Sequence, residues 1–330
     1  MIFYTQEVTV QVDIELLKQF ESGLDPEHPE KSRIPAQVLG YGEISTIFEI
    51  QAGSTANLAC KRMAIFNTQD EVSHYERIYN GYNTVLQKEI GISVPEYGFA
   101  WFTAAKGNII AFDLQQKLPA GSIGNRAIHQ LDTDNIRTLF LCVLRELMKV
   151  WAFNKANPGR ALGIDGQISN WSVAGFDAAN PRINADTKLL YFDTSTPLMK
   201  KDGRELLDPE LFLRSAPSFL RWLIRWLFLE GVMTRYYDAR LVTTDLIANF
   251  YKEQRPELVP PLVEAANGFY ASEGKALGIV PLTEKEIKAY YSEDKTIWVV
   301  FLALRRFDRW LHKYVLRKPY IYILPGDIKR

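Results

Sequence analysis

The strongest constraint on the fold is a single change of character along the 330-residue chain. From about residue 33 to 118 the sequence consists of short runs rich in β-branched and aromatic residues, which are typical of strands. From about residue 132 onward, longer segments with the apolar spacing of amphipathic helices follow. No internal repeat is visible. We therefore expect an α+β protein with a β-rich N-terminal part and a mainly helical C-terminal part.

The same patterns predict individual elements. Strands are expected at 35–39, 46–51, 57–65, 96–102 and 108–115, with one helix at 69–88 that ends before Gly91. In the second part, helices are expected at 134–156, 209–230, 244–251, 257–270, 283–291 and 295–317. A short β-like stretch, 171–176 and 188–193, lies between the first two of these helices. The strand-rich part thus carries one helix, and the helical part carries one small hairpin.

Composition excludes several classes of protein. The chain has 39 Lys and Arg against 39 Asp and Glu, so no overall charge draws it to nucleic acid. Its two cysteines, Cys60 and Cys142, lack the spacing of a zinc site or a disulfide scaffold. No apolar run approaches the roughly 20 residues of a membrane span. The N-terminus lacks the features of a signal peptide. We expect a cytoplasmic protein without a transmembrane segment.

A glycine-containing turn lies between the first two expected strands. Gly40 and Gly42 stand in the run Leu-Gly-Tyr-Gly-Glu-Ile-Ser, which ends at Ser45. Glycines at such a turn allow backbone N–H groups to approach phosphate oxygens closely. An ordinary hairpin turn uses the same residues. Both interpretations are open from the turn alone.

A lysine and a glutamate follow this turn. Lys61 lies about 20 residues later among alternating apolar positions, so it points either inward toward an anion or outward from an edge strand. Glu76 in the following helix is placed to hold the Lys61 ammonium as an ion pair. Glu71 and Glu89 are its rivals for that role.

Two acidic motifs lie in the helical part. Asp165 and Asn170 are five residues apart in a polar loop, a spacing that lets a carboxylate face a hydroxyl while an amide oxygen faces a metal. Asp193 ends an apolar strand, where a carboxylate is a suitable magnesium ligand. Helix capping and turn formation are the alternative roles of these residues.

In this order, the glycine turn, strand lysine, helical glutamate, Asp-x4-Asn loop and strand-end Asp resemble the protein kinase-like superfamily. The short loop from Asp165 to Asn170 is closest in style to aminoglycoside phosphotransferases and choline kinases. The resemblance covers roughly residues 33–235, and the chain looks like a member of an uncharacterised bacterial family of this kind. It implies a bilobal fold, with an N-terminal extension at 1–32, a small antiparallel N-lobe at 33–118 and a helical C-lobe at 119–330.

The resemblance also implies roles for single residues. Gly40, Gly42 and Ser45 would cover the phosphates of ATP, Lys61 would contact the α- and β-phosphates, and Glu76 would steady Lys61. The segment 115–118, with Gln116 and Leu118, would lie against adenine. Asp165 would accept or orient the hydroxyl of the acceptor, and Asn170 and Asp193 would hold Mg²⁺.

The function implied is an ATP- and Mg²⁺-dependent transfer of phosphate to the hydroxyl of a small molecule. Gly163 and Gln167 stand where members of this superfamily usually carry a His and a basic residue. These two departures favour an alternative, a nucleotide-binding pseudokinase or interaction module without phosphotransfer. Transfer of AMP in the same cleft is a third possibility, and the sequence does not select the acceptor.

Overall fold

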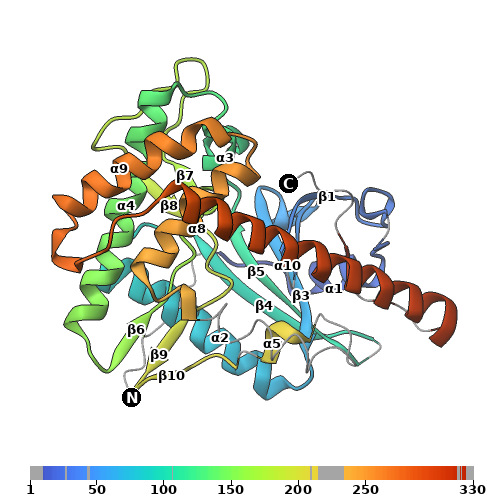
Figure 1. Ribbon diagram of the computed structural model, residues 1–330. Helices are drawn as coiled ribbons and strands as arrows, with labels where there is room; N and C mark the ends of the chain where they lie inside the picture. Colours follow the sequence, from blue (N-terminus) through green and yellow to red (C-terminus); the bar gives the residue numbers. More distant parts are fainter. Residues whose placement is uncertain are drawn as a thin grey trace.

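The computed structural model describes residues 10–26, 28–42, 45–105, 107–208, 210–214, 234–317, 320 and 322–324. It confirms an α+β protein with an antiparallel sheet in the N-terminal part and helices in the C-terminal part (Figure 1). The five-stranded sheet has the order β1-β2-β3-β5-β4. Its strands are β1 (Ala36–Tyr41), β2 (Ser45–Ile50), β3 (Leu58–Phe66), β4 (Tyr97–Thr103) and β5 (Ile109–Gln116). All five predicted strands are present within two residues of their expected ends.

The two faces of this sheet pack against different helices because side chains alternate along each strand. Helix α1 (Ile14–Ser22), which the sequence analysis did not identify, buries Leu17 and Phe20 against a face that includes Phe48 and Phe112. Helix α2 (Gln69–Thr84) covers the opposite face with Tyr75 and its apolar neighbours. Lys61 and Asp113 alternate with Cys60 and Phe112, so they belong to the α2 face.

Helix α1 is fastened to the sheet by a largely buried ion pair. The Arg62 guanidinium donates to both carboxylate oxygens of Glu21, at 2.7 and 2.6 Å. The two side chains are 7% and 14% exposed, so each ion needs the other to compensate its lost hydration. Residues 14–22 are therefore an integral part of the sheet's packing.

Helix α2 was predicted closely. Thr68 caps its N-terminus by accepting a hydrogen bond from the Glu71 backbone N–H, and the helix continues as a wider π-helical turn, Val85–Ile90. Gly91 then adopts φ 79°, in the left-handed region that glycine enters without strain. The chain consequently turns directly back into β4.

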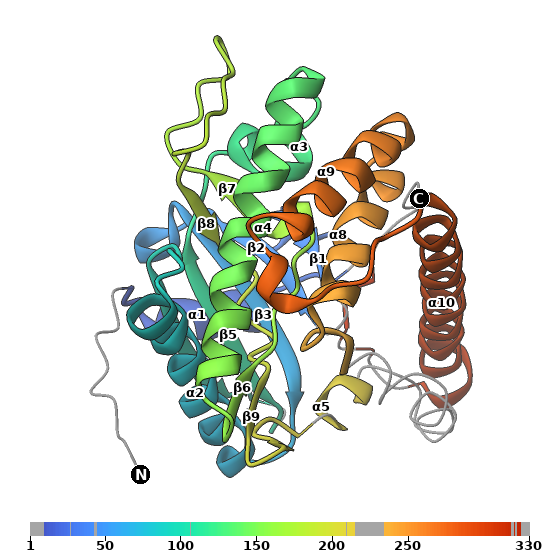
Figure 2. The same cartoon turned by 60° about the vertical axis from the view of Figure 1, so that its left-hand side comes forward.

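The C-terminal part is built around helix α4 (Thr133–Ala156), with α8 (Ala239–Lys252) and α9 (Val259–Ala271) beside it (Figure 2). Short elements connect these helices: α3 (Gly124–Ala127), α5 (Glu210–Leu213), β6 (Arg160–Leu162), β7 (Trp171–Val173), β8 (Leu189–Tyr191), β9 (Met199–Lys201) and β10 (Arg204–Glu205). The predicted β-like stretch is the antiparallel pair β7 and β8, in which Trp171 lies opposite Tyr191.

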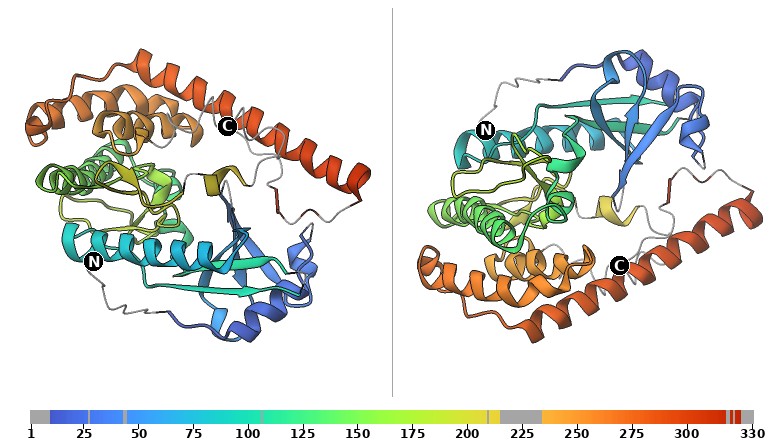
Figure 3. Two further views of the ribbon diagram at one scale, coloured as in Figure 1. Left: turned by 90° about the horizontal axis from the view of Figure 1, so that it is seen from below. Right: turned by 90° about the horizontal axis from the view of Figure 1, so that it is seen from above.

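Helix α10 (Glu284–Trp310) differs from the prediction. The expected helices 283–291 and 295–317 form one continuous helix, followed by the π-helical turn Leu311–Leu316. The intervening Ser-Glu-Asp is polar but contains neither Gly nor Pro, so nothing interrupts the backbone hydrogen bonding. The helix begins beside α8 and extends along the molecule to the side where the N-terminal sheet lies (Figure 3).

The described residues bear on two further expectations, the helix at 209–230 and the lack of a transmembrane segment. Of the helix expected at 209–230, only α5 and Arg214 fall within the described residues, and the rest lies outside them. Within the described part of the chain, no helix is long and apolar enough to cross a membrane.

Loss of the core ring at Phe112 should destabilise the sheet strongly. Phe112 is fully buried and packs against Phe20 and Phe102. We expect Phe112→Ala to lower the free energy of unfolding by about 3–5 kcal/mol because the substitution leaves a cavity. The surface control Val280→Ala, at a residue 67% exposed, should change it by less than about 0.5 kcal/mol. Urea unfolding measures the free energy of unfolding of both variants, and equal values for the two would contradict this packing.

Candidate active site

A cavity of about 700 Å³ lies between the N-terminal sheet and the C-terminal helices. Its walls come from the β1–β2 hairpin, β3, β5, the segment after β5, the loop before β7, the end of β8, α8 and α10. Nine of the ten site residues proposed from the sequence line it: Gly40, Gly42, Ser45, Lys61, Gln116, Leu118, Asp165, Asn170 and Asp193. Residues far apart in the sequence therefore share one enclosed space.

Lys61 contacts Asp193 at the floor of this cavity. Its Nζ donates to Asp193 Oδ1 at 2.8 Å and also to Ser195 Oγ. Ser195 in turn donates to the same carboxylate oxygen at 3.2 Å. Burial alone would raise the pKa of Asp193, but the Lys61 ammonium and the two hydrogen bonds outweigh it and lower that pKa. Asp193 is therefore an anion at neutral pH.

Lys61 has a second acidic neighbour that the sequence analysis missed. Asp113 on β5 is its direct cross-strand partner and is only 2% exposed. Burial raises the pKa of Asp113 to about 7, although Lys61 acts in the opposite direction. The signal for this residue was an acid in the middle of the apolar run Ile-Ile-Ala-Phe-Asp-Leu. The run does not show whether the sheet face that carries this acid is covered, so its burial is visible only in the fold.

Tyr75 links Asp113 to the segment after β8. Its hydroxyl oxygen lies 3.1 Å from Asp113 Oδ2 and 2.7 Å from the Ser195 carbonyl oxygen. A phenol has one proton and donates it to one acceptor at a time. A protonated Asp113 supplies the second hydrogen, so both contacts are satisfied when the Asp113 carboxyl is neutral. The raised pKa of Asp113 agrees with this arrangement.

Glu76 does not hold Lys61, and this expectation needs correction. The Glu76 carboxylate accepts a hydrogen bond from Trp101 Nε1 at 3.2 Å instead. Helix α2 turns Tyr75 toward the cavity floor, and the next residue is rotated by about 100° from it. The two rivals are also engaged elsewhere, because Glu71 pairs with Arg214 and Glu89 pairs with Arg160.

The loop before β7 holds Asp165 close to other acids. Asp165 Oδ1 accepts a hydrogen bond from the Gln167 backbone N–H at 3.1 Å. Burial and the neighbouring carboxylates of Asp245 and Asp193 raise the pKa of Asp165 above its ordinary value. This carboxyl can therefore take up a proton near neutral pH, as a general base requires.

Gly163 is supported differently from the histidine that the superfamily resemblance would place there. Its backbone N–H donates to the Leu198 carbonyl, and its own carbonyl accepts from the Tyr82 hydroxyl, each at 2.9 Å. A Cβ at this position would lie 3.0 Å from Leu198 Cβ and 3.2 Å from the Tyr237 ring. A side chain has no room here, and the surrounding hydrogen bonds hold the loop.

The β7–β8 pairing brings Asn170 next to the segment that carries Asp193. Asn170 precedes β7, and its carbonyl accepts the Phe192 backbone N–H at 3.1 Å. Its side-chain amide nitrogen donates to the Asp165 carbonyl at 3.3 Å, which leaves the amide oxygen for another partner. The chain between the two strands, 174–188, returns at the far end of the pair. The short β7–β8 ladder thus brings Asn170 and Asp193 together although they are far apart in the sequence.

These groups fit a magnesium ion that is also bound by phosphate. Within the described residues no three His, Cys, Asp or Glu side chains gather as a complete metal site. Mg²⁺ commonly takes one or two protein oxygens and completes its shell with phosphate oxygens and water. Asp193 and the Asn170 amide oxygen match that requirement in number and chemistry.

Two cations from the helical part also line the cavity. Lys252, at the end of α8, donates to Gln167 Oε1 at 3.2 Å, and it helps to keep the pKa of Asp193 low. Arg235 donates to the hydroxyls of Tyr290 and Tyr236, each at 2.9 Å. The Gln167 amide nitrogen binds Asp245 of α8 at 3.0 Å. No local motif surrounds Lys252, so sequence reasoning did not find it.

The segment after β5 lines the cavity and contains one backbone N–H without an acceptor among the described residues. The Gln116 and Lys117 backbone N–H groups donate to the carbonyls of Glu96 and Asn57, each at 2.9 Å. The Leu118 N–H has no acceptor in the part of the chain that the structure describes. Leu118 itself lines the cavity, and a backbone N–H without an intramolecular acceptor is a suitable donor to the acceptor nitrogen of a planar ligand.

The glycine turn lies directly above Lys61. The Gly42 N–H donates to the Ser45 carbonyl at 3.0 Å, and a Cβ on Gly42 would lie 2.6 Å from Ser45 Oγ and 3.7 Å from Lys61 Cε. Ser45 Oγ is buried without a hydrogen-bond partner. Residues 43 and 44 at the tip lie outside the described residues.

Comparison with known proteins assigns the chain to a family. Residues 27–309 match the family of unknown function DUF6206, and the chain belongs to this family. No curated protein matches the sequence. Among solved structures, WaaP in complex with acyl carrier protein shows 12% identity and a TM-score of 0.32, over 80% of this chain and 97% of the other.

The raised pKa of Asp113 predicts a pH-dependent stability. The folded protein holds a proton on Asp113 that the unfolded chain releases, so this residue lowers stability as pH rises from about 4 to about 7. Asp113→Asn removes that loss. As pH rises from 5 to 8, the free energy of unfolding of the variant, measured in urea, should increase by more than about 1 kcal/mol relative to that of the parent. Parallel pH profiles would contradict a buried neutral Asp113.

Proposed function

We propose that this protein is an ATP- and Mg²⁺-dependent phosphotransferase that phosphorylates a hydroxyl of a small molecule. The proposed architecture is bilobal and kinase-like, with a nucleotide-binding lobe at 33–118, a helical lobe at 119–330 and an N-terminal extension at 1–32. The cavity lies between these two parts of the chain.

The contact between Lys61 and Asp193 carries the proposal. It pairs a strand lysine with a strand-end carboxylate across 132 residues, next to a glycine turn and an amide oxygen. A lysine that faces a phosphate and a carboxylate that faces a metal need to lie this close when one Mg-nucleotide joins them. The surrounding cavity is large enough for a ligand of nucleotide size.

In this proposal each wall of the cavity holds one part of ATP. The adenine ring lies against the segment with Gln116 and Leu118, where the Leu118 N–H donates to a ring nitrogen. Gly40, Gly42 and the buried hydroxyl of Ser45 lie over the phosphates. Lys61 contacts the α- and β-phosphates after it leaves Asp193.

Asn170 and Asp193 would hold the magnesium ion. When bound, Mg²⁺ neutralises phosphate charge and orients the terminal phosphoryl group. Asp193 is the stronger ligand because its carboxylate is charged at neutral pH. Asn170 contributes a neutral amide oxygen, whose direction is set by its hydrogen bond to the Asp165 carbonyl.

Asp165 would act on the acceptor. The acceptor oxygen attacks the γ-phosphorus, the bond to the bridging oxygen of ADP breaks, and the acceptor proton passes to Asp165 and then to water. The raised pKa of Asp165 favours this proton uptake. Its hydrogen bond to Gln167, which in turn binds Asp245 of α8, supports an acceptor site on the helical side of the cavity.

Lys252 supports phosphotransfer over a pseudokinase role. Gln167 carries no charge where a basic residue is expected, but Lys252 binds the Gln167 side chain and lines the same cavity. A cation in this place stabilises charge that develops on the phosphoryl oxygens. The departure at Gln167 is thus compensated by a residue from another element.

Nucleotide binding should appear as a rise in thermal midpoint. At about 100 times the dissociation constant, Mg-ATP adds roughly 2.7 kcal/mol to stability, which corresponds to several degrees. Lys61→Ala and Asp193→Ala should abolish the shift because each removes a phosphate or metal contact. Lys149→Ala, which removes a solvent-exposed lysine paired with Glu146, should keep it. A parent protein without a shift would reject the nucleotide site.

Removal of the Lys252 charge should slow transfer with little loss of ATP binding. We expect Lys252→Ala to lower kcat about 10²-fold or more on any acceptor that the parent phosphorylates. Lys252→Arg keeps the charge and should recover part of the rate. The measurement is ADP release at saturating ATP, combined with mass analysis of the product. Full activity of Lys252→Ala would remove Lys252 from the mechanism.

A further inference from the structure

The second half of α10 has a strongly basic composition. From 295 to 317 the chain carries six Lys or Arg residues and one acid, Asp308, which is buried. The whole protein has zero formal charge, so these cations form a local excess. Since surface potentials decay within a Debye length, a partner close to this helix experiences that local charge.

The outer face of the same helix is apolar and exposed. Val299, Val300, Phe307, Trp310 and Tyr314 are between 45% and 62% exposed. Their spacing follows the helical period, so they form one stripe over about four turns, along α10 and into the π-helical turn Leu311–Leu316. Phe307 and Trp310 stack with ring centroids 5.9 Å apart, and the Tyr314 ring follows at 6.2 Å from Trp310. Three adjacent aromatic rings thus lie on the surface.

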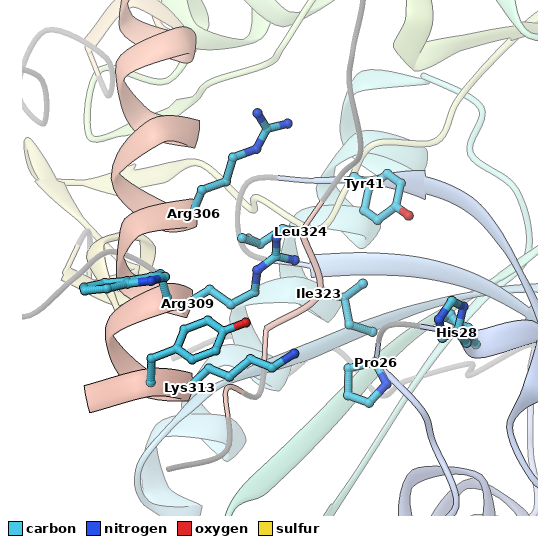
Figure 4. A pocket seen from close by; sticks show the side chains of 11 residues that line it. Pro26, His28, Tyr41, Arg306, Arg309, Lys313, Ile323 and Leu324 are labelled. Atoms are coloured by element: carbon cyan, nitrogen blue, oxygen red, sulfur yellow. The ribbon is translucent and has the colours of Figure 1, made fainter. Parts of the chain in front are cut away.

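Cations flank this stripe at a separate pocket of about 490 Å³ (Figure 4). Arg306 and Arg309 of α10 project toward Ile323 and Leu324, as does Lys313 of the following π-helical turn, and Tyr41 of β1 lies on the far side. These three cations are exposed. Among the described residues, the acid Glu30 lies near this pocket. Its Oε1 is 3.4 Å from His28 Nδ1, and it raises the pKa of Tyr41 in addition to the effect of burial.

We propose that the second half of α10 is a docking surface for a bilayer that contains anionic phospholipids. A helix with aromatic residues on one face and cations along its flank lies in the membrane interface, with its rings among the acyl chains and its cations at the headgroups. Each Lys or Arg near an acidic bilayer contributes favourably. The pocket of Arg306, Arg309 and Lys313 receives a headgroup phosphate.

The inner face of α10 relates this surface to the cavity. Ile297, Phe301 and Leu304 line the large cavity, and Val300 at the edge of the stripe lines it too, whereas the other four residues of the stripe do not. A bilayer on the outer face would therefore lie one helix diameter from the cavity. The proposal concerns localisation of the protein to lipid, and it stands whether or not the cavity binds nucleotide.

Sedimentation with vesicles tests the proposal without nucleotide. The parent protein should sediment with phosphatidylcholine vesicles that contain about 30% phosphatidylserine, and not with phosphatidylcholine alone. Arg309→Glu combined with Lys313→Glu should weaken partitioning at least about tenfold, and so should Trp310→Ser combined with Tyr314→Ser. The charge control is Lys201→Glu with Lys275→Glu, and the apolar control is Val280→Ser. All of these control residues are exposed and lie off α10.

Three outcomes would overturn the proposal. One is a parent protein that stays in solution with both kinds of vesicle. A second is equal loss of binding in the α10 variants and in the controls, at unchanged thermal midpoints. The third is a dimer in size-exclusion chromatography that Trp310→Ser dissociates, because a second copy of the chain would then cover the stripe.

Discussion

The pairing of Lys61 with Asp193 is the interaction on which the site depends. It joins a strand of the N-terminal sheet to the end of β8 and fixes the floor of the cavity. Lys61 keeps Asp193 charged despite burial, as the lowered pKa of Asp193 shows. Ser195, in the segment after β8, accepts hydrogen bonds from Lys61 through its hydroxyl and from Tyr75 of α2 through its carbonyl. The two parts of the chain therefore meet at a charged contact with hydrogen-bonded surroundings.

Four carboxyl groups lie around this contact. Asp113, Asp165, Asp193 and Asp245 lie close enough to affect one another's ionisation, either directly or through a shared neighbour, against Lys61, Lys252 and Arg235. Such a set is costly to bury unless some carboxyls stay protonated or a cation binds. The raised pKa values of Asp113 and Asp165 reflect the first solution. A divalent ion at Asp193, as the proposed function requires, would supply the second and free Lys61 for phosphate.

The strands of the sheet and most helices were predictable because their apolar periods are local properties of the sequence. The break expected before residue 295 was wrong, since three polar residues without Gly or Pro do not end a helix. Local reasoning found Lys61, Asp165, Asn170 and Asp193 because each stands in a recognisable run. It missed Asp113 and Lys252, whose importance comes from cross-strand register and from the packing of α8. It also proposed Glu76 as the ion-pair partner of Lys61, whereas α2 directs Tyr75 toward Asp113 and turns Glu76 to Trp101.

The central claim is that one Mg-nucleotide joins Lys61, Asn170 and Asp193. The most direct measurement is an anomalous difference map from crystals grown with a non-hydrolysable ATP analogue and Mn²⁺, which replaces Mg²⁺. We expect one strong peak between Asn170 and Asp193, with Lys61 moved from the carboxylate to the phosphates. A nucleotide bound elsewhere, or a cavity without nucleotide and metal at millimolar concentrations, would contradict it.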